Sequence, residues 1–215
     1  LTLGFWSTLV TLLTMLIVGK GVQKGIEKSV SWMMPGLVIM LVVLIGFGLF
    51  SGGFGAAVNF LFSFNAGSLS SEGLLAALGH AFFTLSLASG AILTYGSYLP
   101  KEASIGRTTL SVAVADTVVA LMAGLAIFPV IFANGMNPGQ GPGLIFMSLP
   151  LAFQAMPLGT LFGILFFLML SMAALTSAIS MVEATVSWLC DNKGLSRPAA
   201  AWGTGIVLWL ISPLA

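Results

Sequence analysis

The sequence predicts an all-α membrane protein with six transmembrane helices, and two observations support this prediction. Hydrophobic residues make up 58% of the 215 residues and charged residues only 6%, a balance far from that of soluble proteins. Every Lys and Arg also falls in one of three short windows, at residues 20–28, 101–107 and 193–197. Two stretches without Lys or Arg, 51–73 and 134–157, alternate with them, and the positive-inside rule places the basic windows in the cytoplasm.

Six apolar segments can serve as the predicted spans. Their expected ranges are 1–19, 29–50, 74–98, 108–133, 158–190 and 198–215. We expect them to form a single transmembrane region that is a fragment of a larger transporter. The basic loop after the first span leads into an inner segment that holds Gly25 and Pro35, two residues that weaken a helix. This segment is either an ordinary junction between loop and helix or a hinge.

The third span is interrupted by polar and small residues. Thr84, Ser86 and Ser89 would fall on different sides of one helix, and Gly90 weakens the helix further. Lipid tolerates irregular backbone only where protein or a water-filled cavity covers it. The sequence therefore predicts a discontinuous third span with a binding site at its break.

Two of the acidic residues lie within predicted spans, Asp116 in the fourth and Glu183 in the fifth. A carboxylate near the centre of a bilayer costs about 2.5 to 3.5 kcal/mol, so it is a functional candidate that needs a partner. We expect no Lys or Arg at that depth, which leaves a bound cation, a proton or a group outside this chain as the partner. The alternative for Asp116 is a protonated acid bonded to a neighbouring helix. Glu183 could instead reach toward the cytoplasmic interface.

The second outer stretch contains an apolar piece that we expect to be bounded by Pro150 and Pro157. This piece is too short to cross a bilayer. We therefore expect a re-entrant or lid-like hairpin on the outer side.

Three motifs resemble the neurotransmitter:sodium symporter family, in particular its bacterial amino-acid transporters. Residues 82–87 (FFTLSL) and 90–95 (GAILTY) are similar to the sixth helix of that family, and residues 173–177 (AALTS) resemble its eighth. Gly25 and Pro35 match the family's Gly-x9-Pro motif at the fifth helix. Because the motifs occur in the family's order and spacing, the chain resembles helices four to nine of a twelve-helix protein.

The resemblance implies a sodium-coupled symporter with an inverted-repeat fold, which imports an amino acid by alternating access across a bacterial plasma membrane. It implies no enzymatic activity and two sodium ions. Thr84 and Asp116 would contact the first ion, and Ala173, Thr176 and Ser177 the second. Each site would be completed by a helix absent from this chain.

The resemblance also implies a position for the amino-acid substrate along the interrupted helix. Backbone carbonyls in the break would accept hydrogen bonds from the substrate ammonium group, and nearby side chains would line its side-chain pocket. The implied substrate residues are Phe83, Thr84, Ser86, Ser89, Ser177 and Met181.

Further implications concern the hinges, the pocket width and chloride. Gly25, Pro35 and Gly90 would act as hinges. A bacterial member of the family has a phenylalanine where Ser89 stands here, so we expect a wider pocket. Asp116 stands where that member has an asparagine, and its charge would make chloride unnecessary.

Two other functions are compatible with some of these residues. An intramembrane serine protease would use Ser86 or Ser89 with His80, but His80 and Ser86 are six positions apart and neither serine lies in a nucleophile-elbow motif. A membrane channel would need a continuous polar lining, whereas these polar residues cluster at one depth. The symporter is therefore the favoured prediction.

Overall fold

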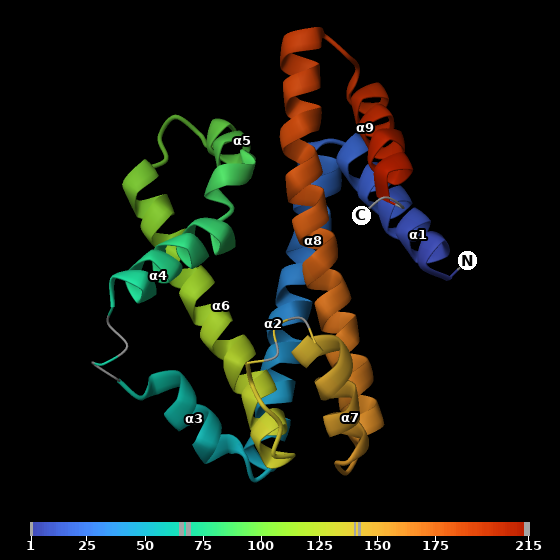
Figure 1. Ribbon diagram of the computed structural model, residues 1–215. Helices are drawn as coiled ribbons and strands as arrows, with labels where there is room; N and C mark the ends of the chain where they lie inside the picture. The colour runs from blue at the N-terminus through green and yellow to red at the C-terminus, as the bar shows by residue number, and fades with distance from the viewer. Residues whose placement is uncertain (1, 65–66, 68–69, 140, 142, 213–215) are drawn as a thin grey trace. The chain divides into compact units, whose positions relative to one another are not determined.

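A computed structural model describes residues 2–64, 67, 70–139, 141 and 143–212, and these residues contain helices and no strand. The all-α prediction is therefore confirmed for the part of the chain that is described. The helices (Figure 1) are α1 (Thr2–Gly19), the π-helix η1 (Val22–Glu27), α2 (Lys28–Leu49), α3 (Phe54–Phe62), α4 (Ser71–Thr84), the 3₁₀-helix η3 (Leu87–Ser89), α5 (Ala91–Ser97), α6 (Ile105–Ala133), the π-helix η4 (Leu144–Ser148), α7 (Leu149–Gln154), α8 (Gly159–Lys193) and α9 (Arg197–Ile211).

Three of the described helical segments are long and apolar enough to cross a membrane. They are Lys24–Leu49, Ile105–Ala133 and Gly159–Lys193. The other three expected ranges contain shorter helices, namely α1, the pair α4 and α5, and α9. Six spans therefore remain a prediction.

The two outer stretches contain helices that the sequence did not predict. The first stretch contains α3, and the second contains η4 and α7. Pro150, which we expected at the start of the apolar piece, lies in the first turn of α7. Proline fits there because the first turn of a helix leaves its N–H groups unpaired in any case. The lid-like hairpin stays a prediction, and Gln140 and Pro142 at its start lie outside the described residues.

The chain divides into two compact units, and unit 1 comprises residues 1–35, 86–102 and 171–215. Its buried core joins α1, η1, α8 and α9 through Met15, Ile26, Ile179 and Ala201. Helices α1 and α9 lie side by side (Figure 1). A Cβ atom on Gly205 of α9 would lie only 2.4 Å from the Met15 side chain, so glycine is what allows this close packing.

Unit 2 comprises residues 36–85 and 103–170. Helix α3 packs on α6, where a Cβ atom on Gly53 would lie 2.1 Å from the carbonyl oxygen of Pro129. The Phe60 ring extends this contact to Phe128 and Phe132, at centroid distances of 4.9 and 5.5 Å. Edge-to-face pairs of this kind add to the stabilisation from burial.

Serine caps fix the start of the two helices in unit 2 that carry the first candidate site. Ser70 precedes α4, and its hydroxyl accepts a hydrogen bond from the backbone N–H of Gly73 at 3.0 Å. Ser104 precedes α6 and accepts from the N–H of Arg107 at 3.4 Å. Each cap satisfies an amide that the first turn leaves unpaired.

Candidate cation and substrate site

The interruption predicted for the third span is present in the structure. Helix α4 ends at Thr84 and α5 begins at Ala91, with the single turn η3 between them. Ser86 (φ 54°) and Gly90 (φ 78°) flank that turn in the left-handed conformation. Serine reaches this conformation at a steric cost that glycine avoids. The carbonyl of Ser86 is also partly occupied, because the hydroxyl of Ser89 donates to it at 2.9 Å.

The first candidate cation site lies in unit 2, where the end of α4 meets the middle of α6. The Thr84 hydroxyl donates to both carboxylate oxygens of Asp116, at 2.7 and 2.8 Å. Both side chains are half-buried. An ionised carboxylate accepts at about four lone-pair positions, so one hydroxyl leaves most of them available. The bond also directs the Thr84 proton toward Asp116 and leaves the oxygen lone pairs of Thr84 free for a cation.

The second candidate cation site lies on α8 in unit 1. The Thr176 hydroxyl donates to the carbonyl of Ala173 at 2.8 Å, which holds two of the implied sodium ligands close together. Ser177 follows Thr176 by about 100° around the helix. Carbonyl and hydroxyl oxygens are hard ligands, which suit an alkali cation better than a transition metal.

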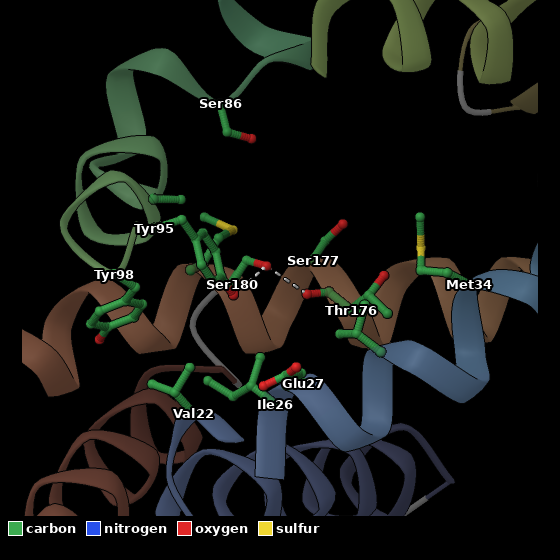
Figure 2. Close-up of a pocket in the computed structure, with 13 residues that line it drawn as sticks. Val22, Ile26, Glu27, Met34, Ser86, Tyr95, Tyr98, Thr176, Ser177 and Ser180 are labelled. Atoms are coloured by element: carbon green, nitrogen blue, oxygen red, sulfur yellow. Dashed lines mark hydrogen bonds between the residues drawn. The ribbon is translucent and has the colours of Figure 1, made fainter. Parts of the chain in front are cut away.

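A cavity of about 520 Å³ opens beside this turn of α8. Figure 2 shows that it is lined from α8 by Thr176, Ser177 and Ser180, from the other elements of unit 1 by Ser86 and Tyr95, and by residues of η1 and α2. Its oxygen groups include those of α8, of Ser86 and Tyr95, and of Glu27 in η1. This cavity therefore brings together Ser86 and Ser177 of the implied substrate residues with Thr176 of the implied sodium ligands.

A second cavity of about 610 Å³ lies between Ser89, α8 and α9. Met181 lines both of these cavities, whereas Ser89 lines the second and not the first. Phe83 and Thr84, the remaining implied substrate residues, belong to unit 2. Their role in binding the substrate stays a prediction.

Glu183 has a cationic partner within this chain, so the expectation that neither acid meets a Lys or Arg is wrong for this residue. The Glu183 side chain is fully buried and forms an ion pair with Arg197, and it also accepts a hydrogen bond from the Tyr98 hydroxyl. We call Tyr98, Glu183 and Arg197 the Glu183 cluster. Burial lowers the pKa of Arg197, but the hydrogen bond and the charge of Glu183 outweigh this effect and raise the pKa above its usual value.

A turn after α8 explains why this partner is near. The helix ends at Lys193, and Gly194 adopts the left-handed conformation (φ 65°) with its N–H bonded to the carbonyl of Cys190. This αL cap reverses the chain direction, so Arg197 at the start of α9 returns to α8. The Nε atom of Arg197 also donates to the carbonyl of Val18 at 3.2 Å, near the end of α1.

The segment with Gly25 and Pro35 is helical throughout. Gly25 lies in the π-helix η1 and Pro35 lies inside α2, so the junction is not an open loop. A Cβ atom on Gly25 would lie 2.0 Å from the carbonyl oxygen of Ile17. Glycine is therefore required for η1 to pack against the end of α1. π-Helical turns often occur at functional sites, and the sequence pattern did not reveal this one.

An interrupted helix with carbonyl and hydroxyl oxygens beside it, carried by apolar helices, is characteristic of membrane secondary transporters. The chain belongs to the sodium:neurotransmitter symporter family, whose model matches residues 3–211. This match confirms the resemblance that the three motifs indicated. Members of the family are transporters rather than enzymes, and the apolar helices indicate an integral membrane protein.

Three relatives illustrate the match. An uncharacterized sodium-dependent transporter of Bacillus subtilis is 43% identical over 199 residues, which are 93% of this chain and 44% of the relative. An uncharacterized sodium-dependent transporter of Haemophilus influenzae is 34% identical over 206 residues, 96% of this chain and 44% of the relative. The sodium-dependent nutrient amino acid transporter 1 of Drosophila ananassae is 33% identical over 148 residues, 63% of this chain and 23% of the relative.

A solved structure has the same fold. The crystal structure of MhsT in complex with L-phenylalanine matches with a TM-score of 0.84 and 42% identity, over 97% of this chain and 47% of the MhsT chain. This chain thus spans about half the length of the bacterial relatives and of the structure that it matches.

Proposed function

We propose that the full-length protein is a sodium-coupled symporter that imports an amino acid by alternating access, as a multi-pass protein of the bacterial plasma membrane. The observation that carries this proposal is the contact between Thr84 and Asp116. Among the described residues, this carboxylate has a hydroxyl donor and no Lys or Arg partner, so it supplies the negative charge and the hard oxygens that a sodium ion needs. Both relatives in bacteria are sodium-dependent transporters by name, which supports the choice of ion.

We assign two sodium ions to the protein, as the family resemblance implies. Thr84 and Asp116 would bind the first ion, and Ala173, Thr176 and Ser177 the second. Each ion would need further ligands from a helix outside this chain. The 215-residue piece by itself should therefore not transport, and saturable uptake by the piece alone would contradict this assignment.

Chloride should not be required, because Asp116 carries a fixed negative charge where chloride-dependent members need a bound anion. One charge on the protein offsets one sodium ion at short range. Chloride independence thus follows from the same contact that supports sodium binding.

The substrate we propose is an amino acid with a bulky apolar or aromatic side chain. MhsT was crystallised with L-phenylalanine. The family resemblance also implies that the small Ser89 stands at a pocket position where a bacterial member has a phenylalanine. In unit 1, Ser89 and Met181 border a cavity of about 610 Å³. Gly25, Pro35 and Gly90 would serve as hinges, since glycine and proline weaken a helix.

The decisive experiment is uptake of labelled L-phenylalanine into liposomes that contain the full-length protein. We expect saturable uptake that needs a sodium gradient and continues when gluconate replaces chloride. Choline in place of sodium is the control. A channel would give flux that does not saturate, and a protease would give no accumulation, so either result would overturn the proposal.

The substrate class has its own test in Ser89→Phe. The added ring should narrow the pocket and shift the preference toward smaller amino acids, because overpacking a fitted cavity typically costs about 1 to 3 kcal/mol. Competition of labelled uptake by a panel of amino acids measures the ranking. An unchanged ranking would show that Ser89 does not face the substrate.

A further inference from the structure

A chain of hydrogen bonds in unit 1 runs from α5 into the turn of α8 that carries the second candidate cation site. The Tyr95 hydroxyl donates to the Ser180 hydroxyl at 3.1 Å, and Ser180 donates to the backbone carbonyl of Thr176 at 3.0 Å. The Thr176 hydroxyl in turn donates to the carbonyl of Ala173 at 2.8 Å. Figure 2 shows Ser180 between Tyr95 and Thr176 on the wall of the cavity.

The Tyr95 ring and its hydroxyl group have different surroundings. The ring packs against the buried core of unit 1 and meets the ring of Tyr98 edge to face, with centroids 6.3 Å apart. The hydroxyl group reaches Ser180 instead. Packing against the core therefore fixes the position of the Tyr95 ring, and the hydrogen bond to Ser180 connects its hydroxyl group to one turn of α8.

Helix α5 depends on such side-chain contacts for its position. It has seven residues and follows Gly90, which is in the left-handed conformation. A helix this short is not stable by itself in water, so contacts with other elements must hold it. Two hydrogen bonds join this segment to α8, one from Tyr98, the residue that follows α5, to Glu183, and one from Tyr95 to Ser180. Only the second of these leads to the candidate sodium ligands.

We propose that Tyr95 and Ser180 form a latch that holds α5 on α8 and positions Thr176 and Ala173 for the second sodium ion. This inference rests on the proposed function. Tyr95 and Ser180 are positioning residues, since they act on the ion through Thr176. Coupling between binding and conformation is reciprocal, so a closed latch favours bound sodium and bound sodium favours the closed latch.

The test compares Tyr95→Phe, Ser180→Ala and the double variant in the full-length protein, with sodium-dependent binding of labelled L-phenylalanine in detergent as the measurement. A hydrogen bond typically contributes about 0.5 to 1.5 kcal/mol, so each single variant should raise the half-saturating sodium concentration by about three- to tenfold. The double variant should behave like Ser180→Ala, because that variant already removes the bond between Tyr95 and Ser180. Binding at saturating sodium should be retained.

Two controls separate a latch from a general loss of structure. Ser97→Ala removes a hydroxyl from the same helix that bonds only within it, to the carbonyl of Thr94, and should leave the sodium dependence unchanged. Ser180→Thr keeps a hydroxyl at this position, so its half-saturating sodium concentration should match that of the parent. Parental sodium dependence in both single variants, or additive effects in the double variant, would overturn the latch alone. If the parent itself bound substrate without sodium, the proposed function would fail, and the latch with it.

Discussion

Asp116 and Glu183 are both acids within long apolar helices, yet their surroundings differ. Glu183 in unit 1 is fully buried, pairs with Arg197 and accepts a hydrogen bond from Tyr98. Asp116 in unit 2 is half-buried and receives the hydroxyl proton of Thr84. The charge of Glu183 is therefore neutralised inside this chain, whereas the partner that the described residues give Asp116 is a neutral hydroxyl.

This difference separates a structural acid from a candidate ligand. A buried carboxylate with a matched arginine leaves little negative charge to attract a mobile ion. A carboxylate whose partner is a hydroxyl keeps its full charge and most of its lone pairs. The kind of partner, more than the depth in the helix, indicates which acid can bind sodium.

The largest effect that we expect is on stability, in Arg197→Gln. The variant leaves Glu183 buried without a counter-charge, and breaking one half of a buried ion pair typically costs about 3 to 5 kcal/mol. Denaturant unfolding of the full-length protein in detergent measures this loss. The exposed Arg107→Gln is the control and should change stability by less than about 0.5 kcal/mol. Equal stability of the Arg197 variant and the parent would show that the ion pair between Glu183 and Arg197 does not stabilise the fold.

A smaller but still large effect is expected on sodium affinity in Asp116→Asn. The amide keeps the size of the side chain and removes its charge, and an opposite charge at contact is worth several kcal/mol even at an effective dielectric constant near 20. We expect the half-saturating sodium concentration for uptake to rise by about 100-fold, which is about 2.7 kcal/mol. An asparagine variant that binds sodium as well as the parent would refute the assignment.

The smallest effect should come from Thr84→Val. The variant loses one candidate ligand of the ion, but it also frees the carboxylate of Asp116 from a competing donor, so the two effects partly cancel. We expect about a threefold rise in the half-saturating sodium concentration, within the usual net worth of one hydrogen bond. Thr84→Ser keeps the hydroxyl and should match the parent in the same uptake assay. A valine variant as deficient as Asp116→Asn would mean that Thr84 is the stronger ligand.

The interrupted helix was predictable because its cause is local. The residues around Ser86 and Gly90 are small or polar, and they sit in a segment that must otherwise satisfy its own backbone in an apolar environment. The motif at residues 173–177 likewise pointed to the turn of α8 where Thr176 and Ala173 meet. Local sequence is enough when the chemistry and the geometry share a few consecutive residues.

The partner of Glu183 was missed because it depends on a reversal of the chain. Arg197 lies 14 residues further on, and it reaches the acid only because Gly194 ends α8 and α9 starts at once. The glycine was a usable signal, since a glycine after the last turn often caps a helix. The π-helices η1 and η4 gave no such signal. A π-turn depends on packing, such as the contact of Gly25 with Ile17, which no periodicity records.

The position of Arg197 also has a consequence for the order of events during synthesis. Domains and segments nearer the N-terminus are made first, so Glu183 leaves the ribosome before its arginine does. Until Arg197 is made, Glu183 has no counter-charge from this residue, and an unpaired acid costs about 2.5 to 3.5 kcal/mol near the bilayer centre. The carbonyl of Val18 at the end of α1 is made much earlier, and it too accepts its hydrogen bond from Arg197 only after Arg197 has been made. Arg197 thus forms two contacts, with Glu183 and with Val18, whose other partners are synthesised before it.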